Sequence, residues 1–393
     1  MERYSFEELK FTERKEKIRI FFLGNFYFDI DKNELLKEGD YNIENGELLF
    51  SGKPRKLEHL INNGFNNLKN SFTDRKAVYI HQNSGIPLIG TSYFGIVDRN
   101  TNLIEIRPST GCNLDCIYCS INESGGKKVD YVLEAEYIIQ EIEKLIIFKQ
   151  ENNIEVHINP QGEPLLYKPL AELVRGIKKI KQVKRISIDT NGTALNKKKV
   201  DELIDSGITQ FNISIDSLSK TKAEEISKKP FPVEKIKDIC NYISARTYLI
   251  LAPIYLPGLN EDDIEDIVSF AKKLKIRVGI QNFLKYKQGK NSPKSISMEE
   301  FYKRLRELEK KYDIKLVYNS EDFRIHSTKK LPAPFKKDEV IDLEVVSPGR
   351  TEKEVIGKAR NRVVEVKDYK GGKRMKGKII RSKHNIFRAT HVG

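Results

Sequence analysis

Three of the four cysteines lie in the stretch Pro108-Ser109-Thr110-Gly111-Cys112-Asn113-Leu114-Asp115-Cys116-Ile117-Tyr118-Cys119, with the spacing C-x3-C-x2-C. Four cysteines in 393 residues are too few for a disulfide framework, and their crowding indicates a metal-binding loop in a reducing compartment. Structural zinc takes four ligands, and the nearest histidine, His157, is far along the chain. Three thiolates suit a four-iron cube whose fourth iron binds a ligand from outside the protein.

The cysteine loop follows the first of six strand-like segments that alternate with helical segments. The predicted strands span residues 103–107, 154–158, 185–189, 211–215, 247–251 and 277–280. The predicted helices span residues 133–149, 168–180, 196–206, 221–244, 261–274 and 298–311. Strict alternation implies parallel strands joined by helical crossovers. Six units are two fewer than the eightfold barrel contains, so the prediction is an α/β fold with a partial (βα)6 barrel.

Two smaller regions flank this core, which we expect to span residues 99–320. Residues 1–98 predict a small α+β region, with strands at 19–22 and 26–28, a turn at Asn45-Gly46 and a helix at 57–68. Residues 321–340 predict a linker. Residues 341–393 combine short strands, glycine turns and many bases, and predict a small β-barrel-like domain.

The cysteine spacing, together with the position of Tyr118 before the third cysteine, resembles the radical S-adenosylmethionine (radical SAM) superfamily over about residues 100–320. The resemblance implies that Cys112, Cys116 and Cys119 hold a [4Fe-4S] cluster. It also implies that S-adenosylmethionine chelates the open iron through its amino and carboxylate groups. An electron from the cluster then cleaves the cofactor to methionine and a 5′-deoxyadenosyl radical.

Further segments that resemble the family follow successive predicted strands, where a barrel builds its site. Gln161-Gly162-Glu163-Pro164 is similar to the family's G-G-E-P segment, which binds the methionine amino group in relatives, although Gln161 replaces the first glycine. The other segments contain T-N-G, a polar strand end and P-G-x-N. The resemblance therefore assigns cofactor binding to Tyr118, Gln161, Gly162, Glu163, Pro164, Thr190, Asn191, Ser214, Asp216 and Pro257. No residue stands out as a general acid or base.

The rest of the sequence disfavours two groups of radical SAM relatives. Cys240 is the only cysteine outside the loop, which disfavours relatives that need an auxiliary cluster, and no D-x-H-x-x-G segment indicates a cobalamin domain. The apolar positions around Cys240 predict buried packing; a radical-relay or methyl-carrying thiol is the alternative.

The excess positive charge is concentrated at the C-terminal end. The chain has a net charge of +14, and residues 358–393 contain twelve bases against two acids. This end resembles the TRAM module of RNA-modifying enzymes. The prediction is an RNA-binding barrel in which Tyr369, His384 and Phe387 stack on bases. The candidate nucleic-acid residues are Lys373, Arg374, Lys376, Lys378 and Arg381. The alternative is a solvated lysine-rich tail.

The leading hypothesis is a cytoplasmic radical SAM enzyme that modifies tRNA or rRNA and takes its electron from a cytosolic donor. The alternatives are an enzyme of small-molecule or cofactor biosynthesis, an activase that installs a radical on a protein, and an RNA-binding protein with a structural cluster. No run of about 18 apolar residues suggests a membrane span, and the first residues do not resemble a secretory signal. The sequence leaves the oligomeric state open.

Overall fold

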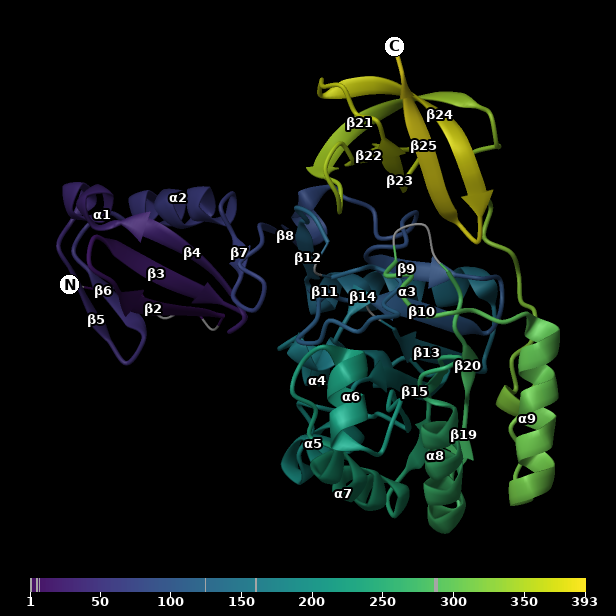
Figure 1. Ribbon diagram of the computed structural model, residues 1–393. Coiled ribbons are helices and arrows are strands. Elements are labelled where there is room, and N and C mark those ends of the chain that lie inside the picture. Colours follow the sequence, from purple (N-terminus) through teal and green to yellow (C-terminus); the bar gives the residue numbers. More distant parts are fainter. Residues whose placement is uncertain (1, 5, 7, 124, 160, 286–288) are drawn as a thin grey trace.

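The structure, a computed structural model, describes residues 2–4, 6, 8–123, 125–159, 161–285 and 289–393 (Figure 1). A central α/β core carries the N-terminal region at one side and a closed β-barrel above one end. Within these ranges, every helix is too short or too polar to cross a membrane.

The core sheet has the order β19-β17-β16-β15-β13-β10-β9, and its first six strands run parallel, which confirms the predicted partial barrel. The parallel strands are β10 (Leu103–Arg107), β13 (Ile154–Ile158), β15 (Val183–Thr190), β16 (Gln210–Ile213), β17 (Tyr248–Leu251) and β19 (Arg277–Val278). The edge strand β9 (Gly95–Asp98) pairs antiparallel with β10. Residues 95–98 therefore lie in the core sheet, whereas the sequence analysis placed them in the N-terminal region.

Helices cover the outer face of this sheet. They are α3 (Ala135–Lys149), α4 (Leu170–Lys178), α5 (Lys197–Ser206), α6 (Lys220–Ser227), α7 (Val233–Ser244), α8 (Glu261–Leu274) and α9 (Met298–Tyr312). The single helix predicted at 221–244 is wrong, because Pro230 and Pro232 separate α6 from α7 and proline cannot continue a helix. Side-chain caps fix two helix starts, with Asn196 accepting from the backbone N–H of Lys199 and Ser297 from that of Glu300.

Apolar and polar residues alternate along the core strands. Ile104 and Ile106 of β10 and Val156 of β13 are fully buried against the helix layer. Their neighbours Glu105 and His157 carry polar groups, and strand geometry sends these to the opposite face, into the barrel interior. The same alternation continues in β15 and β16. Each buried aliphatic side chain contributes about 1.5–3 kcal/mol, so the outer face stabilises the fold while the interior is left polar.

Shorter strands lie around the core strands. Parallel pairs form between β11 (Thr110–Gly111) and β14 (Gln161–Gly162), and between β18 (Ile254–Tyr255) and β20 (Gln281–Asn282). A third parallel pair joins β8 (Ala77–Ile80) to β12 (Asp130–Leu133) and connects the core to the chain that leaves the N-terminal region.

The N-terminal region contains two antiparallel sheets and two helices (Figure 1). One sheet has the order β1-β6-β5, with β1 (Glu2–Tyr4), β5 (Tyr41–Glu44) and β6 (Glu47–Phe50). The other has the order β2-β3-β4-β7, with β2 (Leu9–Glu13), β3 (Lys17–Phe22), β4 (Phe26–Asp31) and β7 (Lys69–Asn70). The helices are α1 (Lys32–Glu38) and α2 (Pro54–Phe65). Phe22 packs edge-on against Tyr79 of β8, with ring centroids 4.7 Å apart, so the region's core continues into the central domain.

The C-terminal barrel closes in the order β21-β22-β23-β25-β24. Its strands are β21 (Val340–Pro348), β22 (Val355–Ala359), β23 (Arg362–Lys367), β24 (Arg374–Lys383) and β25 (Ile386–Val392). Backbone hydrogen bonds attach it to the segment before β9, with Val363 N–H donating to Ile89 O and Phe387 N–H to Gly90 O. A side chain at Gly90 would collide with Val363, since an added Cβ would lie 1.9 Å from its carbonyl oxygen.

A buried ionic cluster joins all three parts of the molecule. Arg350 of the barrel is paired with Glu123 (2.7 Å) and with Asp130 at the start of β12. Arg75, from the connection to the N-terminal region, lies 2.5 Å from Glu123 and 3.8 Å from Asp130. Asp130 also accepts from Thr110, which precedes the cysteine loop. We call these four charged residues the junction cluster.

Replacing Arg350 with methionine tests the junction cluster. We expect R350M to lower the free energy of unfolding by about 3–5 kcal/mol, because two buried carboxylates would then lose the arginine that pairs with both. Denaturant titration followed by circular dichroism measures this change. The control R360M removes an exposed arginine paired with Glu339, at 2.8 Å, and should cost about 1 kcal/mol or less. Equal losses in the two variants would contradict the role of the cluster.

Candidate active site

The cysteine loop begins where β11 ends and lies beside residues 161–164. The parallel pair β11–β14 aligns Gly111 with Gly162, just before Cys112 and Glu163. An added Cβ at Gly162 would lie 2.0 Å from the carbonyl oxygen of Gly111, so only glycine permits this approach. The close approach of the two backbones therefore explains why glycine is required at position 162. At position 161 the structure accommodates the side chain of Gln161.

Backbone contacts fix the middle of the cysteine loop. The amides of Asp115 and Ile117 donate to the carbonyls of Ser227 and Ile226 at the end of α6, each at 3.0 Å. Lys290 ties down the other side, because its Nζ lies 2.5 Å from Asp115 Oδ1 and its amide donates to Cys119 O. Sequence analysis did not find Lys290, since one lysine in a loop carries no recognisable pattern.

The three thiols line one cavity of about 690 Å³. Burial raises the pKa of all three, that of Cys116 to about 12. Iron binding at these sulfurs therefore releases protons. Among the residues that the structure describes, no three His, Cys, Asp or Glu side chains converge to hold a single metal ion. In a four-iron cube each thiolate binds a different iron, so its ligands do not meet at one point.

Glu163 is a buried carboxylate without a charged partner among the contacts that the described residues make. Its Oε1 accepts from the Thr190 hydroxyl (2.5 Å) and the Leu165 amide (3.0 Å), and its Oε2 accepts from the Asn191 amide (2.8 Å). Burial raises the pKa of Glu163 to about 7, although these hydrogen bonds lower it. A cationic group bound here would restore the charged carboxylate.

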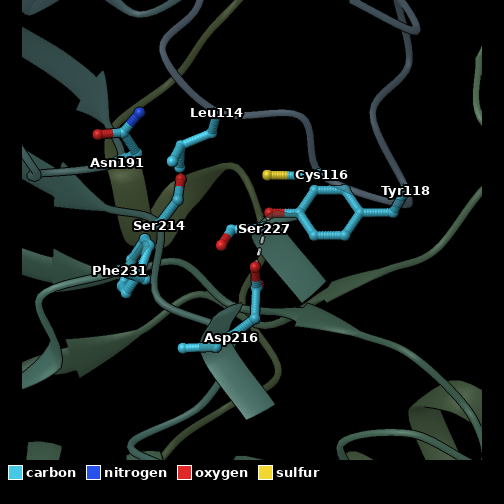
Figure 2. Close-up of a pocket in the computed structure, with 9 residues that line it drawn as sticks. Leu114, Cys116, Tyr118, Asn191, Ser214, Asp216, Ser227 and Phe231 are labelled. Atoms are coloured by element: carbon cyan, nitrogen blue, oxygen red, sulfur yellow. Dashed lines mark hydrogen bonds between the residues drawn. The ribbon is translucent and has the colours of Figure 1, made fainter. Parts of the chain in front are cut away.

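Asp216 forms a second buried acidic position on the other side of the loop (Figure 2). The Tyr118 hydroxyl points toward it and donates to Oδ2 at 2.6 Å, while the Ile254 amide donates to Oδ1. Burial raises the pKa of Asp216 to about 6. Asn260, fully buried at the start of α8, donates to the carbonyls of Asp216 and Ile254. This residue fixes the P-G-x-N segment, although the sequence analysis selected Pro257 instead.

Most of the predicted cofactor residues gather around the cysteine loop. Gln161 and Gly162 line the large cavity with the thiols, and Asn191 and Ser214 line a small adjoining one with Cys116 (Figure 2). Thr190 and Pro164 are buried beside Glu163, where Pro164 opens a short 3-10 turn. Pro257 lies in the loop between β18 and α8 and is not among the residues that line these two cavities.

A histidine–carboxylate pair occupies the polar interior below the loop. His157 Nδ1 lies 2.8 Å from Ser187 Oγ, and its Nε2 lies 3.2 Å from Asp189 Oδ2. Burial lowers the pKa of His157, but the charge and hydrogen bond of Asp189 outweigh it and hold the pKa at about 9. Asp189 lines both the large cavity and a second, deeper one of about 430 Å³, so the two spaces adjoin.

The C-terminal bases divide into two groups. Arg381 lines the large cavity, whereas Lys373, Arg374, Lys376 and Lys378 are exposed on or next to β24. Acidic residues of β21, which pairs with β24, oppose two of them: Asp342 lies across from Lys376, and Glu344 lies across from Arg374. Lys378 pairs with Asp338. The stacking role predicted for Phe387 is wrong, since its ring is fully buried against Phe335.

Comparison with known proteins agrees with this site. The Radical SAM superfamily model matches residues 106–271. The "Uncharacterized protein MJ0103" of Methanocaldococcus jannaschii is 36% identical in an alignment of 363 positions, and the match covers 83% of each chain. The chain belongs to the radical SAM superfamily. Its cofactors are those of the superfamily, a [4Fe-4S] cluster and S-adenosylmethionine, and the three free thiols of Cys112, Cys116 and Cys119, which line one cavity, fit the ligand set that such a cluster requires.

More distant radical SAM relatives include two cyclases. The GTP 3′,8-cyclase of Peptoclostridium acidaminophilum is 28% identical, with the match covering 58% of this chain and 70% of the cyclase. The probable GTP 3′,8-cyclase of Pyrococcus abyssi is 27% identical, over 63% and 76%. A solved structure of TYW1 with a lysine–pyruvate adduct bound is 20% identical, over 58% and 80%, with a TM-score of 0.42. That TM-score is too low for an argument about function.

Replacing Glu163 with glutamine tests the buried carboxylate. We expect E163Q to weaken S-adenosylmethionine binding about tenfold or more, because it removes the anion that the superfamily places against the amino group. In the wild type the affinity should rise as the pH increases from 6 to 8, since Glu163 ionises near pH 7. Equilibrium dialysis measures both effects. E172Q, at an exposed glutamate of α4, is the control, and an unchanged affinity in E163Q would contradict the assignment.

The interaction of protonated His157 with Asp189 makes a pH-dependent contribution to the free energy of unfolding. The folded-state pKa of about 9 lies above the ordinary value of 6.5, so the contribution is fully present below pH 6.5 and is lost as the pH rises through 9. We expect D189N to lack this decline in the free energy of unfolding, whereas D205N, at an exposed aspartate, keeps it. Denaturant titrations between pH 6 and pH 9.5 measure the difference. The same decline in D189N would refute the pairing.

Proposed function

We propose that the protein abstracts hydrogen from a phosphorylated nucleoside, presented as part of an RNA or as a free nucleotide. Cys112, Cys116 and Cys119 would hold the [4Fe-4S] cluster, which would supply the electron for reductive cleavage of S-adenosylmethionine and so allow hydrogen abstraction from the substrate. An external electron donor provides the electron. The chain's own part is to hold both molecules in one cavity beside the cysteine loop.

One observation carries the substrate class. The cavity that contains the three thiols is walled on its other side by the C-terminal barrel, and its charged lining is mostly positive. The lining cations are Arg99, Arg107, Lys367, Arg381 and Arg388, and Asp189 is the one carboxylate among the described lining residues. A cavity with such an excess of cations attracts an anionic substrate.

Two further facts support a nucleoside. Two similar proteins are, by name, GTP 3′,8-cyclases or probable ones. The residues Lys373, Arg374 and Lys376 are exposed on or next to β24, the strand whose Arg381 lines the cavity, which favours a longer polyanion such as RNA. The acids of β21 that oppose them reduce this charge, which favours a free nucleotide. Both substrates share the phosphorylated nucleoside.

The test uses anaerobically reconstituted, reduced protein with S-adenosylmethionine. Separate reactions receive a mixture of nucleoside triphosphates, total RNA or no addition. We expect 5′-deoxyadenosine to rise with one of the first two, together with a new mass in the nucleotide pool or in the nuclease digest of the RNA. The arm that responds identifies the source of the substrate, and a response to neither would refute the phosphorylated nucleoside.

A matched pair of variants controls this assay. C116A removes a cluster ligand and should abolish 5′-deoxyadenosine formation. C240A makes the same change at a fully buried thiol on α7, remote in sequence from the loop, and should leave it intact. Iron content and the visible absorbance of the cluster show whether each variant was reconstituted. Equal activity of C116A and C240A would contradict the assignment of the loop.

A further inference from the structure

We propose that Arg107, Arg381 and Arg388 form a phosphate subsite where the C-terminal barrel meets the core; this proposal rests on the proposed function and specifies how that substrate is held. The three guanidinium groups come from β10, β24 and β25 and line the cavity that also contains the cysteine thiols. Substrate bound there contacts the barrel through its phosphate while its sugar and base extend toward the cysteine loop.

Arg107 and Arg388 converge on Ser92. Arg107 Nη1 donates to the Ser92 carbonyl, and Arg388 Nη2 lies 3.5 Å from the Ser92 hydroxyl. Glu365 accepts from the Ser92 amide (2.7 Å) and hydroxyl (2.8 Å), and its other oxygen accepts from Arg388 Nε (2.6 Å). Because Glu365 is 1% exposed, this network holds the arginines in fixed positions before any ligand binds.

Carboxylates behind the arginines account for only part of their hydrogen-bonding capacity. Arg107 is 6% exposed and pairs with Glu105 at 3.1 Å, yet its Nε is buried without a hydrogen-bond partner among the described residues. Arg381 Nε is likewise buried without a hydrogen-bond partner, and Arg381 forms no ion pair with the described residues. Both Nε atoms are shielded from solvent, so the donors left for a ligand are the Nη groups of the guanidinium. Those of Arg381 have no hydrogen-bond or ion-pair partner among the described residues, so Arg381 is the main donor of the subsite.

Cations of the core and of the barrel lie close to one another near this position. His384, which precedes β25, has its pKa lowered by burial first and then by the charges of Arg99, Lys383 and Arg381. These cations come from both the core and the barrel, so they act together only because the two parts are docked. Planar guanidinium groups match the oxygens of a phosphate in paired hydrogen bonds, which lysine cannot reproduce. The three guanidinium groups therefore favour a phosphate over a ligand without negative charge.

Inorganic pyrophosphate is the probe, titrated into the anaerobically reconstituted, full-length protein by isothermal calorimetry. We expect R381Q to weaken pyrophosphate binding about tenfold, because one charged, unpaired guanidinium is lost. R381K should recover only part of the affinity, since it keeps the charge but not the planar fork. R306Q removes an exposed arginine of α9 that does not line the cavity and should bind pyrophosphate like the wild type.

The outcomes separate this proposal from the proposed function, because pyrophosphate binding requires no turnover. Wild-type affinity in R381Q, or an equal loss in R306Q, overturns the subsite. The thermal midpoint without ligand shows whether R381Q is folded, and a folded variant that binds tenfold more weakly supports the subsite. If Arg381-dependent binding accompanies no response of 5′-deoxyadenosine to nucleotides or RNA, the subsite is retained and the proposed substrate class fails. An adventitious charge effect would show as equal losses in all the variants.

Discussion

The arrangement of the site depends on the junction cluster, in which Arg350 and Arg75 neutralise Asp130 and Glu123. Asp130 and Glu123 lie on either side of the short segment that joins the cysteine loop to β12, and Asp130 accepts from Thr110, just before the loop. A buried carboxylate without a cation is strongly unfavourable. The arginines of the barrel and of the connection to the N-terminal region therefore stabilise the path of the chain on both sides of the loop. The same contact that folds the loop places the barrel above it.

The second constraint is the two-residue period of the core strands. Apolar residues face the helices and contribute the burial that stabilises the fold, so the inward positions are free to be polar. Glu105, His157 and Asp189 occupy such positions; His157 and Asp189 hydrogen-bond to each other, and Glu105 pairs with Arg107. A barrel filled with aliphatic side chains would have no room for a substrate. Here the interior is a cavity continuous with the space at the cysteine loop, because Asp189 borders both.

The sequence was sufficient for the core and for the grouping of several motif segments around the cysteine loop, because both depend on local patterns. The apolar periodicity located six parallel strands, and short segments after four of them identified residues that meet at one edge, such as Glu163 and Thr190. Contacts between distant parts were not predictable in this way. Arg350 and Lys290 look like ordinary surface bases in the sequence, and only the docked fold buries the first and joins the second to Asp115. The charge balance of the basic tail was likewise not predictable, since the acids opposite Arg374 and Lys376 come from another strand.

A primary carbon radical removes hydrogen from many positions of comparable bond strength, so the selectivity of such an enzyme must come from where the substrate is held. In this molecule the cofactor loops take up the sheet edge, from Gly162 through Asp216. The walls that remain for the substrate are the polar interior and the barrel strands β24 and β25. The barrel is fixed by Gly90, Arg350 and Glu365, so its arginines keep a constant distance from the cysteine loop. A phosphate bound there acts as a fixed point from which the length of the substrate determines which carbon faces the radical.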